Sequence, residues 1–269
     1  MQILLVFCFV ALVNARLFSM NQHVEMRLHV HRSLAGFLPK STDMYYFEIL
    51  KKEQREEVTH FLLENFGKYE PLSKAANITS KEILVSLNMG LDRAFKNEIS
   101  IIARSRATHE IIGCKINSVW RRNDVEETTD QKDFEFEAVR KEVQTLGDLL
   151  NELHEKFWET QTDIDTVIHA EIASVNKNYW RKGIATKFME FTENEHVLKS
   201  VSAFGVVGEV TSFGNQKLLE KRNYKTLYKI ALDSKKDENG KQVLVCDDGT
   251  TEVKLMFKKI LDRSYRSHQ

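Results

Sequence analysis

Hydrophobic and polar residues alternate with two different periods along most of the chain. Short apolar runs that are rich in β-branched and aromatic residues predict strands. These runs are residues 45–52, 99–106, 110–120, 166–175, 201–210, 225–232 and 251–260. Apolar residues three and four positions apart predict helices, which occupy residues 53–70, 77–95, 134–160, 183–200 and 214–224. The chain therefore predicts a single mixed α/β domain without internal repeats.

Three local signals mark where these elements begin and end. We expect Pro71 to close the first helix, because proline cannot continue one. Thr79 or Ser80 suits the N-cap of the second helix. Residues 107–109 separate two strand-like runs, which predicts a hairpin.

The amino terminus has a composition unlike the rest of the chain. Residues 3–13 read ILLVFCFVALV, and a small-residue site follows at residues 13–15. This run is too short to span a bilayer and suits the core of a signal peptide, although residues 1–15 hold no Lys or Arg. A genuine leader and a non-native start before Met20 or Met26 both stay open.

The chain is divided here into a main domain and flanking segments. We assign residues 1–19 to a leader, 20–43 to an extension, 44–262 to the domain and 263–269 to a tail. Within the domain, a charged loop at 121–133 comes before the long helix at 134–160.

The composition fits a folded domain and argues against other classes of protein. Hydrophobic residues make up 42% and charged residues 29%, with only two prolines, which allows a sizeable core. Lys plus Arg and Asp plus Glu both total 39, so a nucleic-acid partner is not expected. Cys8, Cys114 and Cys246 are far apart in the sequence, so neither a disulfide framework nor a metal site is expected.

The stretch NYWRKGIATKF, residues 178–188, joins a buried strand to a helix. N–H groups at a helix start, together with the positive end of the helix dipole, attract phosphate. Gly183 lets the backbone approach a ligand closely, while Arg181 and Lys182 add positive charge. The spacing matches neither a Walker loop nor a dinucleotide-binding fingerprint. The residues alone fit a phosphate site and equally an ordinary helix start with surface cations.

With its flanks, this stretch resembles the central strand, turn and helix of the GNAT superfamily of acetyl-CoA-dependent N-acetyltransferases. The signature Q/R-x-x-G-x-G/A is filled by residues 180–185, with Trp180 where Gln or Arg is usual. The resemblance follows the family's element order from Tyr45 to about Ile260. It implies a mixed, mostly antiparallel sheet of about seven strands, flanked by helices and splayed at the acetyl-CoA site.

The resemblance also implies which residues contact acetyl-CoA. Backbone N–H groups of the strand would bind the oxyanion, and main-chain amides of the turn would bind the pyrophosphate. Trp180 therefore implies weakened or rearranged contacts, not lost binding. The implied contacts are Ala173, Val175, Trp180, Arg181, Lys182, Gly183, Ile184, Ala185, Thr186 and Asn215.

The segment ENFGKYEPLSKA is similar to the F-x-x-D-E-P-L motif of arylalkylamine N-acetyltransferases, especially the insect dopamine type. Residues 69–72 fall on D-E-P-L, with Tyr69 in place of Asp. By this position Glu70 inherits the role of general base, and the family's long segment before the fourth strand matches residues 133–160. Without the resemblance, Glu70 would be read as a helix-end carboxylate before a Pro turn.

The general acid is less clearly defined by the resemblance. Leu219 lies where many superfamily members have a catalytic Tyr, so it cannot donate a proton. The insect-type relatives use two serines, which align with Thr211 and Asn215 here, and Ser212 is a substitute for the first. Thr211 and Ser212 fit helix N-capping equally well. His169 could act as a base, but a single His in an apolar strand is more often a hydrogen-bonded core residue.

These inferences predict an acetyl-CoA-dependent N-acetyltransferase for a small primary amine, preferably an arylalkylamine such as a monoamine. Acetyl transfer to another amine, such as a polyamine or lysine, is one alternative. An acyl-CoA-binding protein that has lost turnover is the other. The expected partners are acetyl-CoA and the amine, and the cytoplasm is favoured over a secretory route through residues 1–15. A membrane partner is unexpected unless the leader is retained.

Overall fold

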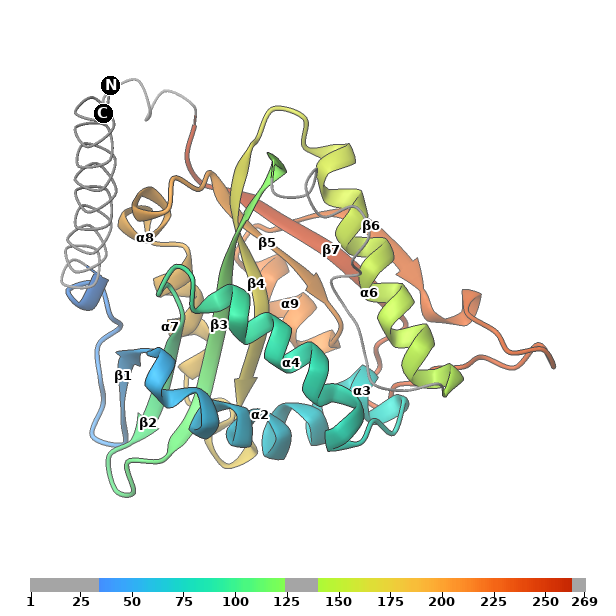
Figure 1. Ribbon diagram of the computed structural model, residues 1–269, viewed down its shortest axis with the longest axis horizontal. Helices are drawn as coiled ribbons and strands as arrows, with labels where there is room; N and C mark the ends of the chain where they lie inside the picture. The colour runs from blue at the N-terminus through green and yellow to red at the C-terminus, as the bar shows by residue number, and fades with distance from the viewer. Residues whose placement is uncertain (1–33, 124–139, 263–269) are drawn as a thin grey trace, which may run out of the picture.

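A single mixed sheet forms the middle layer of the molecule (Figure 1). The computed structural model describes residues 34–123 and 140–262, so the assigned leader and tail lie outside them. The strand order is β1-β2-β3-β4-β5-β7-β6. β4 and β5 are parallel, and the other neighbouring strands are antiparallel. The strands are β1 (Tyr45–Ile49), β2 (Ile101–Ser105), β3 (Ile111–Arg121), β4 (Thr166–Val175), β5 (Gly205–Val210), β6 (Lys225–Ala231) and β7 (Glu252–Lys259).

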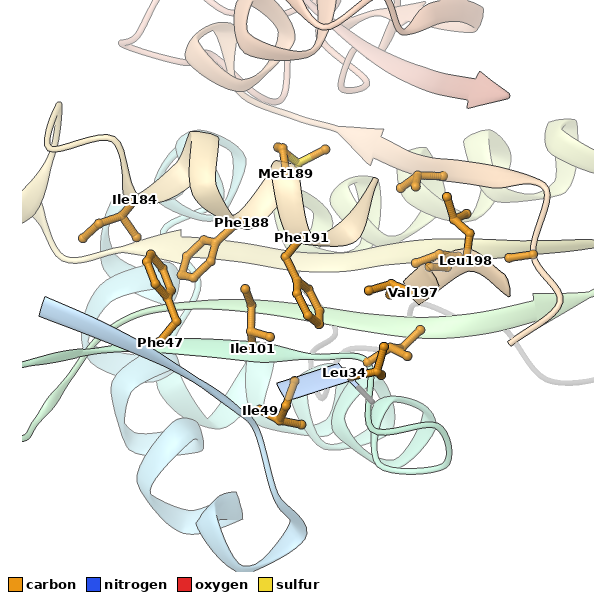
Figure 2. Close-up of a cluster of buried hydrophobic side chains, with 14 of the residues drawn as sticks. Leu34, Phe47, Ile49, Ile101, Ile184, Phe188, Met189, Phe191, Val197 and Leu198 are labelled. Carbon is orange, nitrogen blue, oxygen red and sulfur yellow. The ribbon is translucent and has the colours of Figure 1, made fainter. Parts of the chain in front are cut away.

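Helices cover both faces of this sheet. On one face α2, α4 and α6 pack over two apolar clusters, and on the other α7, α8 and α9 pack over a third. Figure 2 shows this third cluster, where Phe188 and Phe191 of α7 meet Phe47 and Ile101 of the sheet. The helices are α2 (Arg55–Tyr69), α3 (Pro71–Ala75), α4 (Ser80–Ala94), α6 (Lys141–Thr160), α7 (Ile184–Thr192), α8 (Glu195–Ser200) and α9 (Phe213–Lys221), with short 3-10 turns η1 (Lys52–Gln54), η2 (Lys177–Tyr179) and η3 (Leu232–Ser234).

The parallel strands β4 and β5 separate after a short shared stretch. They pair only at Ile168 with Val206 and at His169 with Val207, within the part of the chain that the structure describes. A bulge lies directly after this point, because Ile116 of β3 faces Ile172 while the next residue faces Ala170. The extra residue, Glu171, bends β4 away from β5. The predicted fold class, including the splayed sheet, is confirmed.

Several expected element ends differ in the structure. Pro71 does not simply close a helix: it is the first residue of α3, with Glu70 as N-cap, a position that proline also suits. The predicted helix 183–200 is two helices, because the side chain of Asn194 accepts a hydrogen bond from His196 N at 2.9 Å and starts α8. Thr79 is the N-cap of α4, and the 107–109 hairpin forms.

The region around the predicted charged loop is described only in part. β3 continues to Arg121, which was expected to begin the loop 121–133. Residues 124–139 lie outside the described residues, and the long helix is observed from Lys141 to Thr160. The strand expected from residue 201 begins at Gly205, because Ser202 takes a left-handed conformation with φ 57° after α8. No helix of the described chain is long and apolar enough to cross a membrane.

Candidate active site

The gap between β4 and β5 opens into a cavity of about 450 Å³. On the sheet face covered by α2, α3, α4 and α6, the residues that line the cavity include Glu70 and Leu87. On the opposite face they include Phe188 of α7 and Leu219 of α9. The cavity therefore passes through the sheet and connects its two faces.

The structure brings nearly all the predicted site residues to this cavity. Lys182 does not line it, and its carbonyl instead accepts a hydrogen bond from Tyr45 Oη at 2.8 Å. The predicted residues that line the cavity are Glu70, Ala173, Val175, Trp180, Arg181, Gly183, Ile184, Ala185, Thr186, Thr211, Ser212 and Asn215.

The turn before α7 presents backbone donors to the cavity. Gly183 is the N-cap of α7 with φ 84°, a left-handed conformation that favours glycine. The first helical hydrogen bond runs from Lys187 N to Gly183 O. The N–H groups of residues 184–186 lie in the first turn, before this hydrogen bond. Among the described residues no side chain caps this end. Uncapped N–H groups and the helix dipole make the turn suitable for an anion such as a phosphate.

Trp180 folds back onto the end of β4. Its indole Nε1 donates to the carbonyl oxygen of Val175 at 2.6 Å, and 54% of the residue is exposed. An indole is a donor only, so this hydrogen bond occupies its single polar group. The signature position that usually holds Gln or Arg is therefore used here to fix the path of the turn.

The end of β4 directs backbone groups into the gap. Asn176 N donates to Ile112 O at 2.9 Å, and hydrogen-bonded pairs alternate along an antiparallel ladder. Ala173, opposite Lys115, and Val175, opposite Gly113, are therefore the non-hydrogen-bonded pairs of the β3–β4 ladder. Their N–H and C=O groups point away from β3, toward the side from which β5 has separated. The strand thus offers N–H donors where an oxyanion site was predicted.

Glu70 connects α2 to α3 and faces the cavity. Its carboxylate accepts hydrogen bonds from Leu72 N at 3.2 Å and from Ser73 N at 2.7 Å, which caps α3. Burial raises the pKa of Glu70 above its ordinary value, although these N–H groups and the Thr211 hydroxyl oppose the shift. Glu70 is therefore both the helix-end carboxylate of the alternative interpretation and a cavity carboxylate with a raised pKa.

The candidate acids lie at the junction of β5 and α9. The Thr211 hydroxyl interacts with the Glu70 carboxyl group. Ser212 is the N-cap of α9, and its hydroxyl accepts a hydrogen bond from Asn215 N at 3.3 Å. The capping interpretation is thus confirmed for Ser212, while Thr211 faces the proposed base. Leu219 is a buried part of the cavity wall.

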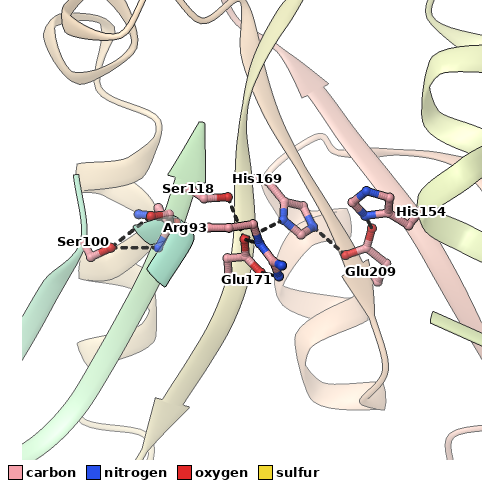
Figure 3. A network of polar contacts seen from close by, with 8 residues as sticks. Arg93, Ser100, Ser118, His154, His169, Glu171 and Glu209 are labelled. Carbon is pink, nitrogen blue, oxygen red and sulfur yellow. Dashed lines mark hydrogen bonds and ion pairs between the residues drawn. The ribbon is translucent and has the colours of Figure 1, made fainter. Parts of the chain in front are cut away.

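A buried polar network crosses the sheet beside the cavity (Figure 3). Arg93 binds the carboxylate of Glu171 through Nε at 2.7 Å and Nη2 at 2.8 Å. His169 lies between two carboxylates, with Nε2 at 2.7 Å from Glu209 Oε2 and Nδ1 at 3.3 Å from Glu171 Oε1. Burial opposes a charge on His169, but Glu209 and Glu171 raise its pKa to about 10. His169 is therefore a hydrogen-bonded core residue, which is the more frequent role of a single His in an apolar strand.

The same network contains a set of side chains of the type that holds a metal. Ligand atoms of His154, His169 and Glu209 lie within 4.8 Å of one another, and two His with one Glu is a donor set typical of zinc. The His169–Glu209 ion pair already occupies two of these atoms. A metal ion would have to displace it.

Three charged residues in the cavity wall were not predicted from the sequence. They are Lys115 on β3, Glu171 at the bulge and Glu209 on β5. Each sits in an apolar run, and a charged residue inside such a run is the signal that could have marked it. Its position at the gap depends on the bulge, which spacing does not reveal.

Several of the solved structures that resemble this chain are N-acetyltransferases. Arylalkylamine N-acetyltransferase 2 from Aedes aegypti shares 25% identity over 81% of this chain and 99% of its own, with a TM-score of 0.69. A mosquito arylalkylamine N-acetyltransferase-like protein, 5b, shares 17% over 80% and 99%, with a TM-score of 0.65. The Drosophila melanogaster polyamine N-acetyltransferase that forms N-acetylagmatine shares 13% over 80% and 99%, also at 0.65.

No protein-family model matches the sequence, and no curated protein matches it. The structural likeness nevertheless confirms the resemblance to the GNAT N-acetyltransferases, with insect arylalkylamine N-acetyltransferases among the most similar structures.

Proposed function

We propose that this GNAT-fold chain is an acetyl-CoA-dependent N-acetyltransferase that acts on a small primary amine, with an arylalkylamine preferred. The observation that carries the proposal is the arrangement of the cavity. An uncapped helix start at Gly183 lies on one side of the β4–β5 gap, and Glu70 with a raised pKa lies on the other. One cavity thus combines a site for an anionic donor with a base for the acceptor amine.

The donor site has backbone N–H groups suited to two polar groups of acetyl-CoA, the pyrophosphate and the thioester carbonyl. The N–H groups of residues 184–186 would bind the pyrophosphate, and the N–H groups of Ala173 and Val175 border the gap. Bound acetyl-CoA supplies a thioester carbonyl. Donors aimed at its oxygen would stabilise negative charge as that charge develops during attack.

Glu70 would prepare the amine for attack. A primary amine has a pKa near about 10 by analogy with lysine, so it enters mostly as an ammonium ion. Glu70 would accept its proton, directly or through water, and its raised pKa brings it closer to the neutral range in which a base works well. The Thr211 hydroxyl would hold the carboxylate in place and could pass a proton to the departing sulfur.

The apolar walls support an aromatic amine over a purely polar one. Leu87 of α4 and Leu146 and Leu150 of α6 line the Glu70 side of the cavity, which favours an acceptor with an apolar body. A binding protein without turnover is the second candidate. It is supported by Leu219 in the cavity wall at the position where many GNAT enzymes have a catalytic Tyr.

Two measurements on the wild-type protein separate these candidates. Calorimetry with acetyl-CoA tests the donor site, and CoA release over a panel of aromatic monoamines and polyamines tests turnover. The enzyme should bind acetyl-CoA and release CoA fastest with an aromatic amine. Binding without release for every amine would instead establish a binding protein.

Gly183→Asp tests the donor site itself. The substitution places a side chain at φ 84° and a negative charge at the start of α7, so it should abolish acetyl-CoA binding. Gly240→Asp is a matched control, because Gly240 also has a positive φ of 76° but no atom lies within 4 Å of its added Cβ. Ordinary acetyl-CoA affinity in Gly183→Asp would refute the assignment.

A further inference from the structure

Lys115 is a buried lysine in the wall of the same cavity. It lies on β3 with 4% of its surface exposed, inside the run IIGCKINSVW. Its side chain makes no hydrogen bond and no ion pair with any of the described residues. Lysines are almost never buried this fully without a partner. Its position therefore calls for an explanation other than an internal ion pair.

The β3–β4 register places Lys115 beside the predicted thioester site. Lys115 faces Ala173 in a non-hydrogen-bonded pair, where the Cα atoms are about 4.5 Å apart and the side chains lie close together on one face. The N–H of Ala173 points into the gap from this pair. A flexible four-carbon stem can bring the Lys115 amine to the same space.

The surroundings of Lys115 also favour a reactive amine. Burial lowers the pKa of Lys115 to about 8, although the thiol of Cys114 and the carboxylates of Glu171 and Glu193 act in the opposite direction. A lysine desolvated in this way is partly neutral near physiological pH, and the neutral amine is the nucleophile. This is the state that the proposed amine substrate reaches only after losing a proton.

We propose that Lys115 is a self-acetylation site. Its Nζ would attack the carbonyl carbon of an acetyl thioester bound in the cavity, so that a C–N amide bond forms and the C–S bond breaks. CoA leaves with the sulfur, and the proton lost from Nζ protonates the thiolate or passes to solvent. One acetyl-CoA is consumed for each lysine modified. The proposal rests on acetyl-CoA as the donor in the proposed function, but not on any amine acceptor.

Acetylation of Lys115 would change the cavity in two ways. The amide carries no charge, and the added acetyl group occupies space between β4 and β5. The modified chain should therefore bind acetyl-CoA less tightly than the unmodified one. Self-acetylation would thus restrain the enzyme when acetyl-CoA is abundant and the amine is scarce.

The test follows the modification directly, by mass spectrometry of the full-length protein. Wild-type protein is incubated with acetyl-CoA in the absence of amine, and acetyl groups are counted on the intact chain and located by peptide mapping. Lys229 is the comparison within the same chain, because its side chain is 62% exposed and does not line the cavity. Lys115→Arg and Lys229→Arg are the matched variants, since Arg keeps the charge but is not a nucleophile here.

We expect one acetyl group per chain, on Lys115, with an occupancy at least about tenfold above that of Lys229. Lys229→Arg should keep this group and Lys115→Arg should lack it. Equal or lower occupancy at Lys115 than at Lys229 would overturn the proposal. The wild-type ratio decides the question even if Lys115→Arg does not fold.

CoA release with added amines, measured in parallel, distinguishes this proposal from the proposed function. Acetylated Lys115 without amine turnover supports self-acetylation and contradicts the enzyme activity. Amine turnover with an unmodified Lys115 supports the enzyme activity and contradicts self-acetylation.

Discussion

Glu70 and Glu209 are carboxylates in the wall of one cavity, but their surroundings give them opposite acid strengths. Burial raises the pKa of Glu70, whose partners are two backbone N–H groups and a hydroxyl. Burial also opposes the charge of Glu209, but His169 lies 2.7 Å away and lowers the pKa of this carboxyl group well below its ordinary value. Neutral partners thus leave a carboxylate able to take a proton, whereas a cation holds it ionised. This difference favours Glu70 over Glu209 as the base.

The largest expected effect comes from removing the carboxylate with neutral partners. Glu70→Gln keeps the shape and an amide oxygen for the α3 cap but cannot accept the amine proton. We expect kcat to fall by at least about 10²-fold at neutral pH, with acetyl-CoA affinity nearly unchanged. Steady-state kinetics and calorimetry measure the two quantities.

Glu64→Gln is the control for this substitution. Glu64 lies on the exposed face of α2 and pairs with Lys68, so its loss should leave kcat unchanged. Equal turnover in Glu70→Gln and wild type would remove Glu70 from the mechanism.

Removing the cation from the other carboxylate should affect stability instead. His169→Ala leaves the buried Glu209 without its 2.7 Å partner and removes a neighbour of Glu171. Breaking a buried pair in this way destabilises by about 3–5 kcal/mol. Urea unfolding measures the loss, with His60→Ala on the exposed face of α2 expected to stay within about 0.5 kcal/mol of wild type. A loss in His169→Ala no larger than this control would contradict the ion-pair interpretation.

The smallest expected effect is a shift of the pH profile. Only the ionised form of Glu70 can act as a base, so kcat/KM should fall as the pH drops through its pKa, which lies above the ordinary value. The Thr211 hydroxyl lowers this pKa, so Thr211→Val should move the acid limb to higher pH and reduce kcat about tenfold. Thr211→Ser should restore both. An unmoved limb in Thr211→Val would show that the hydroxyl does not act on Glu70.

The elements of the fold could be read from periodicity, since the helices bury one face against the sheet and the strands are short apolar runs that these helices cover. The break between α7 and α8 at Asn194 could not be read from periodicity. Phe191 of α7 and Val197 and Leu198 of α8 enter the same apolar cluster, so the helical spacing continues across two helices. Pro71 was ambiguous for a related reason, because proline suits both the end of one helix and the first turn of the next.

For the site too, the features that are local in the sequence could be predicted, whereas those that depend on distant segments could not be predicted from spacing alone. The turn at Gly183 is local, since one glycine between a strand and a helix indicates the left-handed cap. The meeting of Glu70 with Thr211 depended on family resemblance, because the two residues lie far apart in the chain. Lys115 and Glu209 were missed because the bulge at Glu171 opens the sheet beside them. Without that bulge, both strands read as ordinary buried segments.

The indole of Trp180 gives the protein an optical reporter at the entrance to the donor site. The chain has three tryptophans, of which Trp120 and Trp158 are each 9% exposed while Trp180 is 54% exposed. A ligand that donates to the Val175 carbonyl would share this oxygen with the indole or displace it, because a carbonyl oxygen can accept two hydrogen bonds. Occupation of the gap would then change the emission of one tryptophan and leave the other two as an internal reference. The residue that departs from the signature would thereby make ligand binding visible without a label.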